Sequence, residues 1–158
     1  MIEQGDEAPD FALPDQDARA VKLSDFRGQK VVLFFYPKAD TPGCAIQVCG
    51  VRDHHADYAA AGTVVLGISP DPVAKVRKFH EKFALDFALL ADEEHAVAES
   101  YGVWVEKSMY GRKYLGNERT TFIIDSEGRV AEVLRKVKPA EHDEQVLSAL
   151  GEASPPAA

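Results

Sequence analysis

A short apolar segment, Val31–Tyr36, constrains the fold more than any other part of the sequence. It is rich in β-branched and aromatic residues and too short for a buried helix, so it predicts a central strand buried on both faces. Pro42 and Gly43 then break the chain, and helix-compatible sequence continues to about Gly62. A second apolar segment, Thr63–Ser69, predicts the next strand. A strand, a helix and a strand in this order predict a parallel crossover.

The rest of the chain extends this unit on both sides. Asp71 and Pro72 predict a helix start, with Asp71 as its cap and Pro72 at the first helical position. Pro139 opens a last amphipathic helix, which is predicted to end at Gly151. The other segments are two hairpins, an apolar segment, a short helix and an irregular stretch: Asp10–Pro14 with Ala20–Leu23, Thr120–Asp125 with Arg129–Leu134, Leu85–Ala91, Asp92–Tyr101 and Val103–Asn117.

Both cysteines of the protein, Cys44 and Cys49, follow the first predicted strand, and Cys44 falls in or just before the first helical turn. A cysteine reacts as its thiolate, and a free thiol with a pKa of about 8.5 is only slightly ionised at pH 7. Making the thiolate the main form takes about 3 kcal/mol, whereas a helix N-terminus supplies about 0.3–2 kcal/mol. We therefore expect a cation near Cys44. Lys38 is the only cation in this segment, so an arginine from elsewhere is the better candidate.

The five-residue spacing between the cysteines limits what they can do together. On one helix, positions i and i+5 have Cα atoms about 8–9 Å apart and point about 140° apart. A disulfide needs Cα atoms within about 7 Å and facing β-carbons. Cys44 and Cys49 can therefore bond only if the start of the helix unwinds, which suits a transient redox disulfide better than a structural one.

The order of these segments predicts an α/β fold with a mixed central sheet, helices on both faces and an N-terminal β-hairpin. A cysteine at the end of the first core strand makes this plan thioredoxin-like. With 158 residues in all, we expect one domain over residues 1–151. The composition of residues 152–158 predicts a disordered tail.

Composition and charge exclude several classes of function. The chain is 46% hydrophobic and 28% charged, as in soluble globular proteins. Its net charge of −8 disfavours nucleic acids and anionic membranes as partners. The sequence has no apolar run long enough to span a membrane, and residues 1–7 do not resemble a signal peptide. With only two cysteines, close together, we expect a reducing compartment and thus the cytoplasm.

The sequence predicts neither a metal nor an organic cofactor. His54 and His55 follow Cys44 by ten and eleven residues, which suggests zinc. Against this, the chain has no Cys-x-x-Cys motif, and Cys44 and Cys49 would point in different directions on a helix. No glycine-rich phosphate loop is present, so flavin and nicotinamide cofactors are not indicated.

Four motifs in register resemble one protein family. A proline, three residues, a threonine, two residues and a cysteine make up Pro37–Cys44, which resembles the peroxiredoxin signature. Three further motifs resemble the PrxQ branch, the bacterioferritin comigratory proteins: the Cys44–Cys49 spacing, Gly102–Gly111 and Arg119–Asp125. The resemblance extends over roughly Gly5–Leu150 with the same order and spacing.

This resemblance implies a thiol peroxidase that reduces hydrogen peroxide and organic hydroperoxides in antioxidant defence and redox homeostasis. Cys44 resembles the peroxidatic cysteine, which becomes a sulfenic acid. Cys49 resembles the resolving cysteine, which forms an intramolecular disulfide with Cys44. Thr41 would hold thiolate and peroxide, Pro37 would shield the pocket from water, and Arg119 matches the family's arginine. The resemblance also implies recycling by thioredoxin or a similar dithiol, and a monomer or weak dimer.

Each assignment has an alternative that the residues leave open. The cysteines could be small buried hydrophobic residues, Thr41 a helix-entry residue and Arg119 a surface ion-pair partner. A functional alternative is a redox sensor on the same fold, whose cysteine pair reports oxidation to a partner without turnover. A general disulfide oxidoreductase is disfavoured, because its Cys-x-x-Cys motif is absent.

Overall fold

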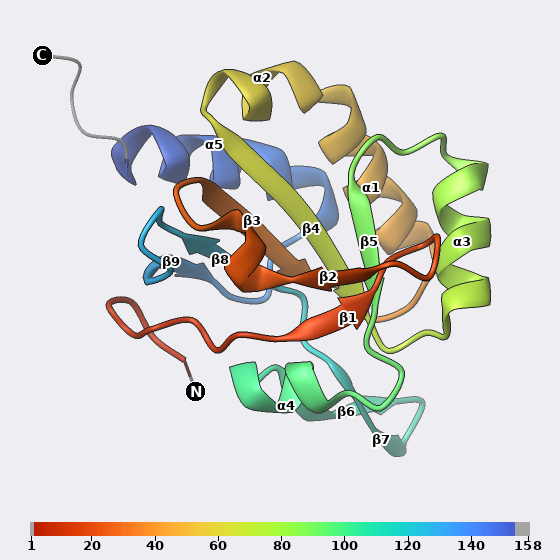
Figure 1. Ribbon diagram of the computed structural model, residues 1–158. Coiled ribbons are helices and arrows are strands. Elements are labelled where there is room, and N and C mark those ends of the chain that lie inside the picture. Colours follow the sequence, from red (N-terminus) through yellow and green to blue (C-terminus); the bar gives the residue numbers. More distant parts are fainter. Residues whose placement is uncertain (1, 154–158) are drawn as a thin grey trace, which may run out of the picture.

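A five-stranded mixed sheet forms the centre of the protein in the computed structural model, which describes residues 2–153 (Figure 1). Its strands, in spatial order, are β5 (Ala88–Ala91), β4 (Thr63–Ser69), β3 (Lys30–Phe35), β8 (Thr120–Ile124) and β9 (Val130–Leu134). The first three run parallel, whereas β8 is antiparallel to both β3 and β9. This arrangement confirms the predicted α/β, thioredoxin-like fold and the parallel crossover from β3 to β4.

Helices cover both faces of the sheet, as predicted, because alternate residues of β3 are buried on opposite sides. Val32 and Phe34 belong to the core beneath four helices on one face, and Leu33 and Phe35 to the core on the other. The four helices on the first face are α1 (Pro42–Asp53), α2 (His55–Ala60), α3 (Val73–Lys82) and α5 (His142–Ala153). The second face is covered by α4 (Ala96–Tyr101), by η1 (Leu23–Phe26) and by the N-terminal segment.

Two hairpins lie outside the central sheet. The predicted N-terminal hairpin is present as β1 (Ala12–Pro14) and β2 (Ala20–Lys22). The stretch from Val103 to Asn117, predicted to be irregular, forms a second hairpin instead, from β6 (Trp104–Met109) and β7 (Arg112–Asn117). That prediction was wrong because this ribbon is largely exposed, so its sequence lacks the alternation of a half-buried strand.

Several predicted helix ends differ from the observed ones. The helix that contains Cys44 does not continue to Gly62, because it is interrupted at His54, which lies between α1 and α2. The last helix begins with a 3-10 turn, η2 (Pro139–Glu141), and α5 runs to Ala153, past its predicted end at Gly151. The rest of the predicted tail, residues 154–158, lies outside the described residues.

The start of α3 also differs from the prediction. Pro72 is the residue before the helix and not its first residue, and Asp71 does not cap it. The Asp71 carboxylate instead accepts a hydrogen bond from the backbone N–H of Ala39, at 2.7 Å. Asp71 thus bonds to a backbone N–H that is distant in sequence instead of capping the helix that follows it.

Within residues 2–153, no helix combines the length and apolar character that crossing a membrane requires.

Candidate active site

Cys44 lies in the first turn of α1, where the chain leaves the central strand β3. Thr41 precedes the helix in an extended conformation, and Pro42 begins it, a position that suits proline because the first helical N–H has no partner within the helix. The Cys44 side chain is fully buried and belongs to the core between the sheet and the helices. Cys49, five residues later on the same helix, is partly exposed, and both cysteines are free. The helix is intact over both residues, so they are in the arrangement that excludes a bond between them.

Arg119 brings a guanidinium group to the buried cysteine. It stands immediately before β8, whose residues pair with β3, so the two ends of this strand pair lie close together. Its Nη2 donates a hydrogen bond to Cys44 Sγ at 3.5 Å. This is the cation that the sequence analysis expects beside the sulfur. Gly43 makes room for it, because a Cβ at Gly43 would lie only 3.2 Å from Arg119 Nη2.

Gln47 is part of this arrangement and was missed by the sequence analysis. Its Oε1 accepts a hydrogen bond from Arg119 Nη1, so one guanidinium group contacts both Cys44 and Gln47. The side chain is fully buried, and its Nε2 has no hydrogen-bond partner among residues 2–153. Its position three residues after Cys44, on the same helix face, is a signal that could have identified it.

The loop between β3 and α1 carries the other two predicted site residues. Thr41 Oγ1 donates a hydrogen bond to Lys38 O at 3.0 Å, and so it is directed at the loop rather than at the sulfur. Pro37 is partly buried at the beginning of this loop. The bond from Ala39 N–H to the buried Asp71 carboxylate fastens the loop to the end of β4. The loop that leads to Cys44 is therefore held in place by Asp71, the residue that the sequence analysis expects to cap α3.

A second cation lies on the β6–β7 hairpin, near Arg119. Lys107 Nζ donates to the backbone oxygen of Asn117 at 2.6 Å, and Asn117 Nδ2 in turn donates to Tyr36 O at the end of β3. Burial and the positive charge of Arg119 lower the pKa of Lys107, although a negatively charged Cys44 thiolate and Glu118 act in the opposite direction. Lys107 and Arg119 also line an open cavity of about 420 Å³. Both positive groups are thus accessible from this cavity, and Arg119 also contacts Cys44 Sγ.

His142, at the start of α5, is fully buried on the same face of the sheet. Its Nε2 is 2.9 Å from Thr121 Oγ1, and its Nδ1 has no hydrogen-bond partner in the described part of the chain. Burial, together with the charge of Arg119, lowers the pKa of His142 to about 4. The imidazole is therefore neutral at pH 7 and adds no charge to the site.

The two histidines considered as zinc ligands have other partners. His54 Nδ1 bonds to Gly50 O at 2.9 Å, and His55 Nδ1 lies 3.2 Å from Asp86 Oδ2. Over residues 2–153, no cluster of three or more His, Cys, Asp or Glu side chains is arranged to hold a metal ion.

Comparison with known proteins agrees with this architecture. The model of the AhpC/TSA family matches residues 4–133. Peroxiredoxin Bcp of Escherichia coli K12 is 48% identical over 151 residues, which cover 96% of this chain and 97% of that protein. Peroxiredoxin Bcp of Bacillus subtilis is 46% identical over 153 residues, covering 97% and 98%.

Solved structures show the same relationship. The crystal structure of Peroxidoxin BcpB from Mycobacterium tuberculosis superposes with a TM-score of 0.88 at 36% identity, over 98% of this chain and all of the other. Peroxiredoxin Q of Xanthomonas campestris superposes with a TM-score of 0.86 at 35% identity, over 91% of this chain and 92% of the other. Because the family model covers most of the chain and these relatives match it nearly end to end, the chain belongs to the AhpC/TSA family, as a peroxidase of the Bcp and PrxQ type of peroxiredoxin.

Proposed function

We propose that this protein reduces hydrogen peroxide and organic hydroperoxides through the thiolate of Cys44. The observation that carries the proposal is the 3.5 Å contact between Arg119 Nη2 and Cys44 Sγ in the first turn of α1. The guanidinium stabilises the thiolate and can also donate to an oxygen that becomes negative as the O–O bond breaks. The relative from Xanthomonas campestris, the bacterioferritin comigratory protein, is described as having alkyl peroxide reduction activity.

The first step is an attack of Cys44 Sγ on the nearer peroxide oxygen. An S–O bond forms and the O–O bond breaks, so the sulfur is oxidised to sulfenic acid and the peroxide is reduced. The departing oxygen takes up a proton and leaves as water or an alcohol. Thr41, whose hydroxyl is now bonded to Lys38 O, would turn to hold the peroxide, and Pro37 would keep water from the sulfur.

The second step resolves the sulfenic acid. Cys49 Sγ attacks Cys44 Sγ, the S–S bond forms, the S–O bond breaks, and the hydroxyl leaves as water with the proton of Cys49. A dithiol of the thioredoxin type then reduces the disulfide by thiol–disulfide exchange. Two free cysteines in the reduced protein suit the cytoplasm, where such reductants act. We also propose that the protein works as a monomer or weak dimer, because both cysteines needed for turnover are in one chain.

A coupled assay tests this function. In the presence of thioredoxin, its reductase, NADPH and peroxide, we expect continuous NADPH oxidation by the wild type. Cys44→Ser should abolish it, and Cys49→Ser should allow peroxide to oxidise Cys44 once without turnover by this reductant. A wild-type protein that consumes one equivalent of peroxide and then stops would favour the alternative, a redox sensor. No oxidation of Cys44 by peroxide at all would refute both.

A further inference from the structure

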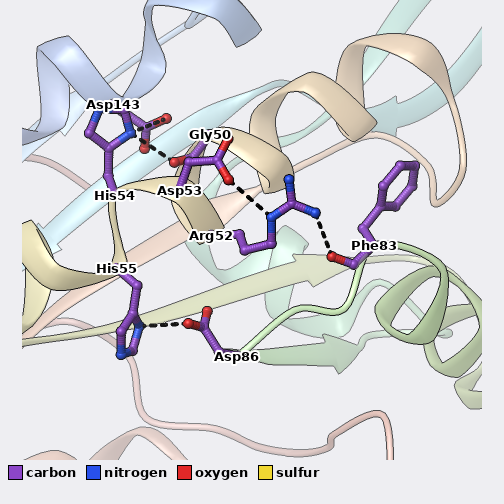
Figure 2. A network of polar contacts seen from close by, with 8 residues as sticks. All are labelled: Gly50, Arg52, Asp53, His54, His55, Phe83, Asp86 and Asp143. Carbon is purple, nitrogen blue, oxygen red and sulfur yellow. Dashed lines mark hydrogen bonds and ion pairs between the residues drawn. The ribbon is translucent and has the colours of Figure 1, made fainter.

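Helix α1 changes its surroundings at Gly50. Before this residue, the polar side-chain contacts of the helix are those of Arg119 with Cys44 and Gln47. After it, the chain is tied to three other elements, as Figure 2 shows. The chain is thus held by different groups before and after Gly50, and only the contacts before Gly50 involve Cys44.

Two contacts tie the chain after Gly50 to the segment that follows α3. Arg52 Nη1 donates to Phe83 O, at the end of α3, at 2.8 Å. One turn later, His55 Nδ1 lies 3.2 Å from Asp86 Oδ2, in the segment that leads to β5 (Figure 2). Both contacts are partly exposed, so each stabilises the helix only modestly.

The stronger attachment is to α5, through Asp143. The Tyr58 hydroxyl of α2 donates to Asp143 Oδ1, and both side chains are buried. His54 Nδ1 lies 3.8 Å from Asp143 Oδ2 and bonds to Gly50 O, so the three groups meet at the break between α1 and α2 (Figure 2). Moving Tyr58 away from this position would expose the buried Asp143 carboxylate and the Tyr58 side chain itself, which is only 2% exposed.

Gly50 lowers the stability of the helix, and Asp143 is the reason that this residue must be glycine. A Cβ at Gly50 would overlap Asp143 Oδ2, so no other residue allows the carboxylate to approach this closely. Glycine inside a helix is about 1 kcal/mol less favourable than alanine. Close approach of Asp143 therefore places a residue that weakens α1 directly after Cys49.

From this arrangement we propose that Asp143 and Tyr58 are positioning residues for disulfide formation: they hold the chain from Gly50 onward, so that only Pro42–Cys49 unwinds when Cys44 and Cys49 bond. The proposal rests on the function proposed above. The helix must unwind, because its intact geometry keeps the two sulfur atoms apart. Unwinding that stops at Gly50 leaves Val51 and Tyr58 in the core and places Cys49 next to a fixed point.

Amide hydrogen exchange measured by NMR tests where the unwinding stops. The disulfide is made with diamide, so the test does not depend on peroxidase activity. Each helical N–H bonds to the carbonyl four residues earlier, so unwinding up to Cys49 also frees the N–H groups as far as Asp53. We expect at least a tenfold loss of protection over residues 45–53. The amides of His54 and Tyr58, which bond to Gly50 O and His54 O, should change less than twofold.

Two mild substitutions test the residues that set this limit. In Tyr58→Phe and Asp143→Asn, we expect the His54 and Tyr58 amides to lose at least fivefold more protection in the disulfide form than in the reduced form. A merely structural role would lower protection equally in both forms. Glu144→Gln, at an exposed neighbour of Asp143 on α5, is the matched control and should behave as the wild type.

Three results would overturn the proposal. They are the loss of His54 and Tyr58 protection in the wild-type disulfide, unchanged behaviour of both variants, and failure of diamide to form the Cys44–Cys49 bond. If the exchange pattern is as expected while peroxide fails to oxidise Cys44, the proposed function is wrong and the hinge at Gly50 stands.

Discussion

His142 should make the protein sensitive to acid, because a buried neutral imidazole must be protonated when the chain unfolds at low pH. The side chain has no exposed surface, and its ring lies 5.4 Å from that of Phe34. Its Nδ1 is 3.8 Å from Asp143 Oδ1, which is too far for a hydrogen bond. Burial and the positive charge of Arg119 therefore prevail, and the pKa of His142 falls from 6.5 to about 4.

The size of the effect follows from this pKa. One pKa unit corresponds to about 1.4 kcal/mol, so the shift from 6.5 to about 4 represents about 3 kcal/mol of stability. Because the folded-state pKa is depressed, the unfolded chain binds the proton first as the pH falls. The contribution is thus fully present above pH 6.5 and is lost as the pH falls toward 4. At about pH 4.5, roughly 2 kcal/mol should already be gone.

Urea unfolding of the wild type and of His142→Asn measures this loss. The variant keeps a polar side chain next to Thr121 but cannot titrate. Between about pH 7 and about pH 4.5, the wild type should lose roughly 2 kcal/mol more free energy of unfolding than the variant, since other groups act equally in both. Parallel pH profiles of wild type and His142→Asn, or an NMR titration of His142 near 6.5, would refute the reasoning.

Three other substitutions probe the site itself. Arg119→Ala should slow the oxidation of Cys44 by peroxide about 10–100-fold, as expected for a lost hydrogen bond to a charged group, and slow its alkylation by iodoacetamide much less. Equal slowing in both stopped-flow assays would mean that Arg119 only stabilises the thiolate. Gly43→Ala, whose Cβ would lie 3.2 Å from Arg119 Nη2, should displace the guanidinium and reduce the peroxide rate several-fold; an unchanged rate would show that the contact is not needed. Asp71→Ala should destabilise the protein by about 1–3 kcal/mol in urea unfolding, because it leaves a buried N–H unpaired in the loop before Cys44, and a loss below about 0.5 kcal/mol would contradict this.

The central part of the fold and the position of Cys44 were predictable because they depend on local patterns. An apolar segment, a Pro-Gly break and a second apolar segment are enough for a strand, a helix and a parallel strand, and all three are present. The five-residue spacing of the cysteines also excludes a disulfide on an intact helix, whatever surrounds it. The β6–β7 hairpin was not predictable in this way, because its strands are largely exposed and bear no alternating pattern.

The contacts that turn this junction into a site were decided only by the tertiary structure. Arg119 reaches Cys44 across 75 residues of sequence, because pairing of β8 with β3 brings both to one end of the sheet. Asp71 is a good helix cap by its local sequence, yet it bonds to Ala39 N–H, since a buried donor from a distant loop is the more favourable partner. Local propensity therefore placed the sulfur, whereas long-range strand pairing placed the charge beside it.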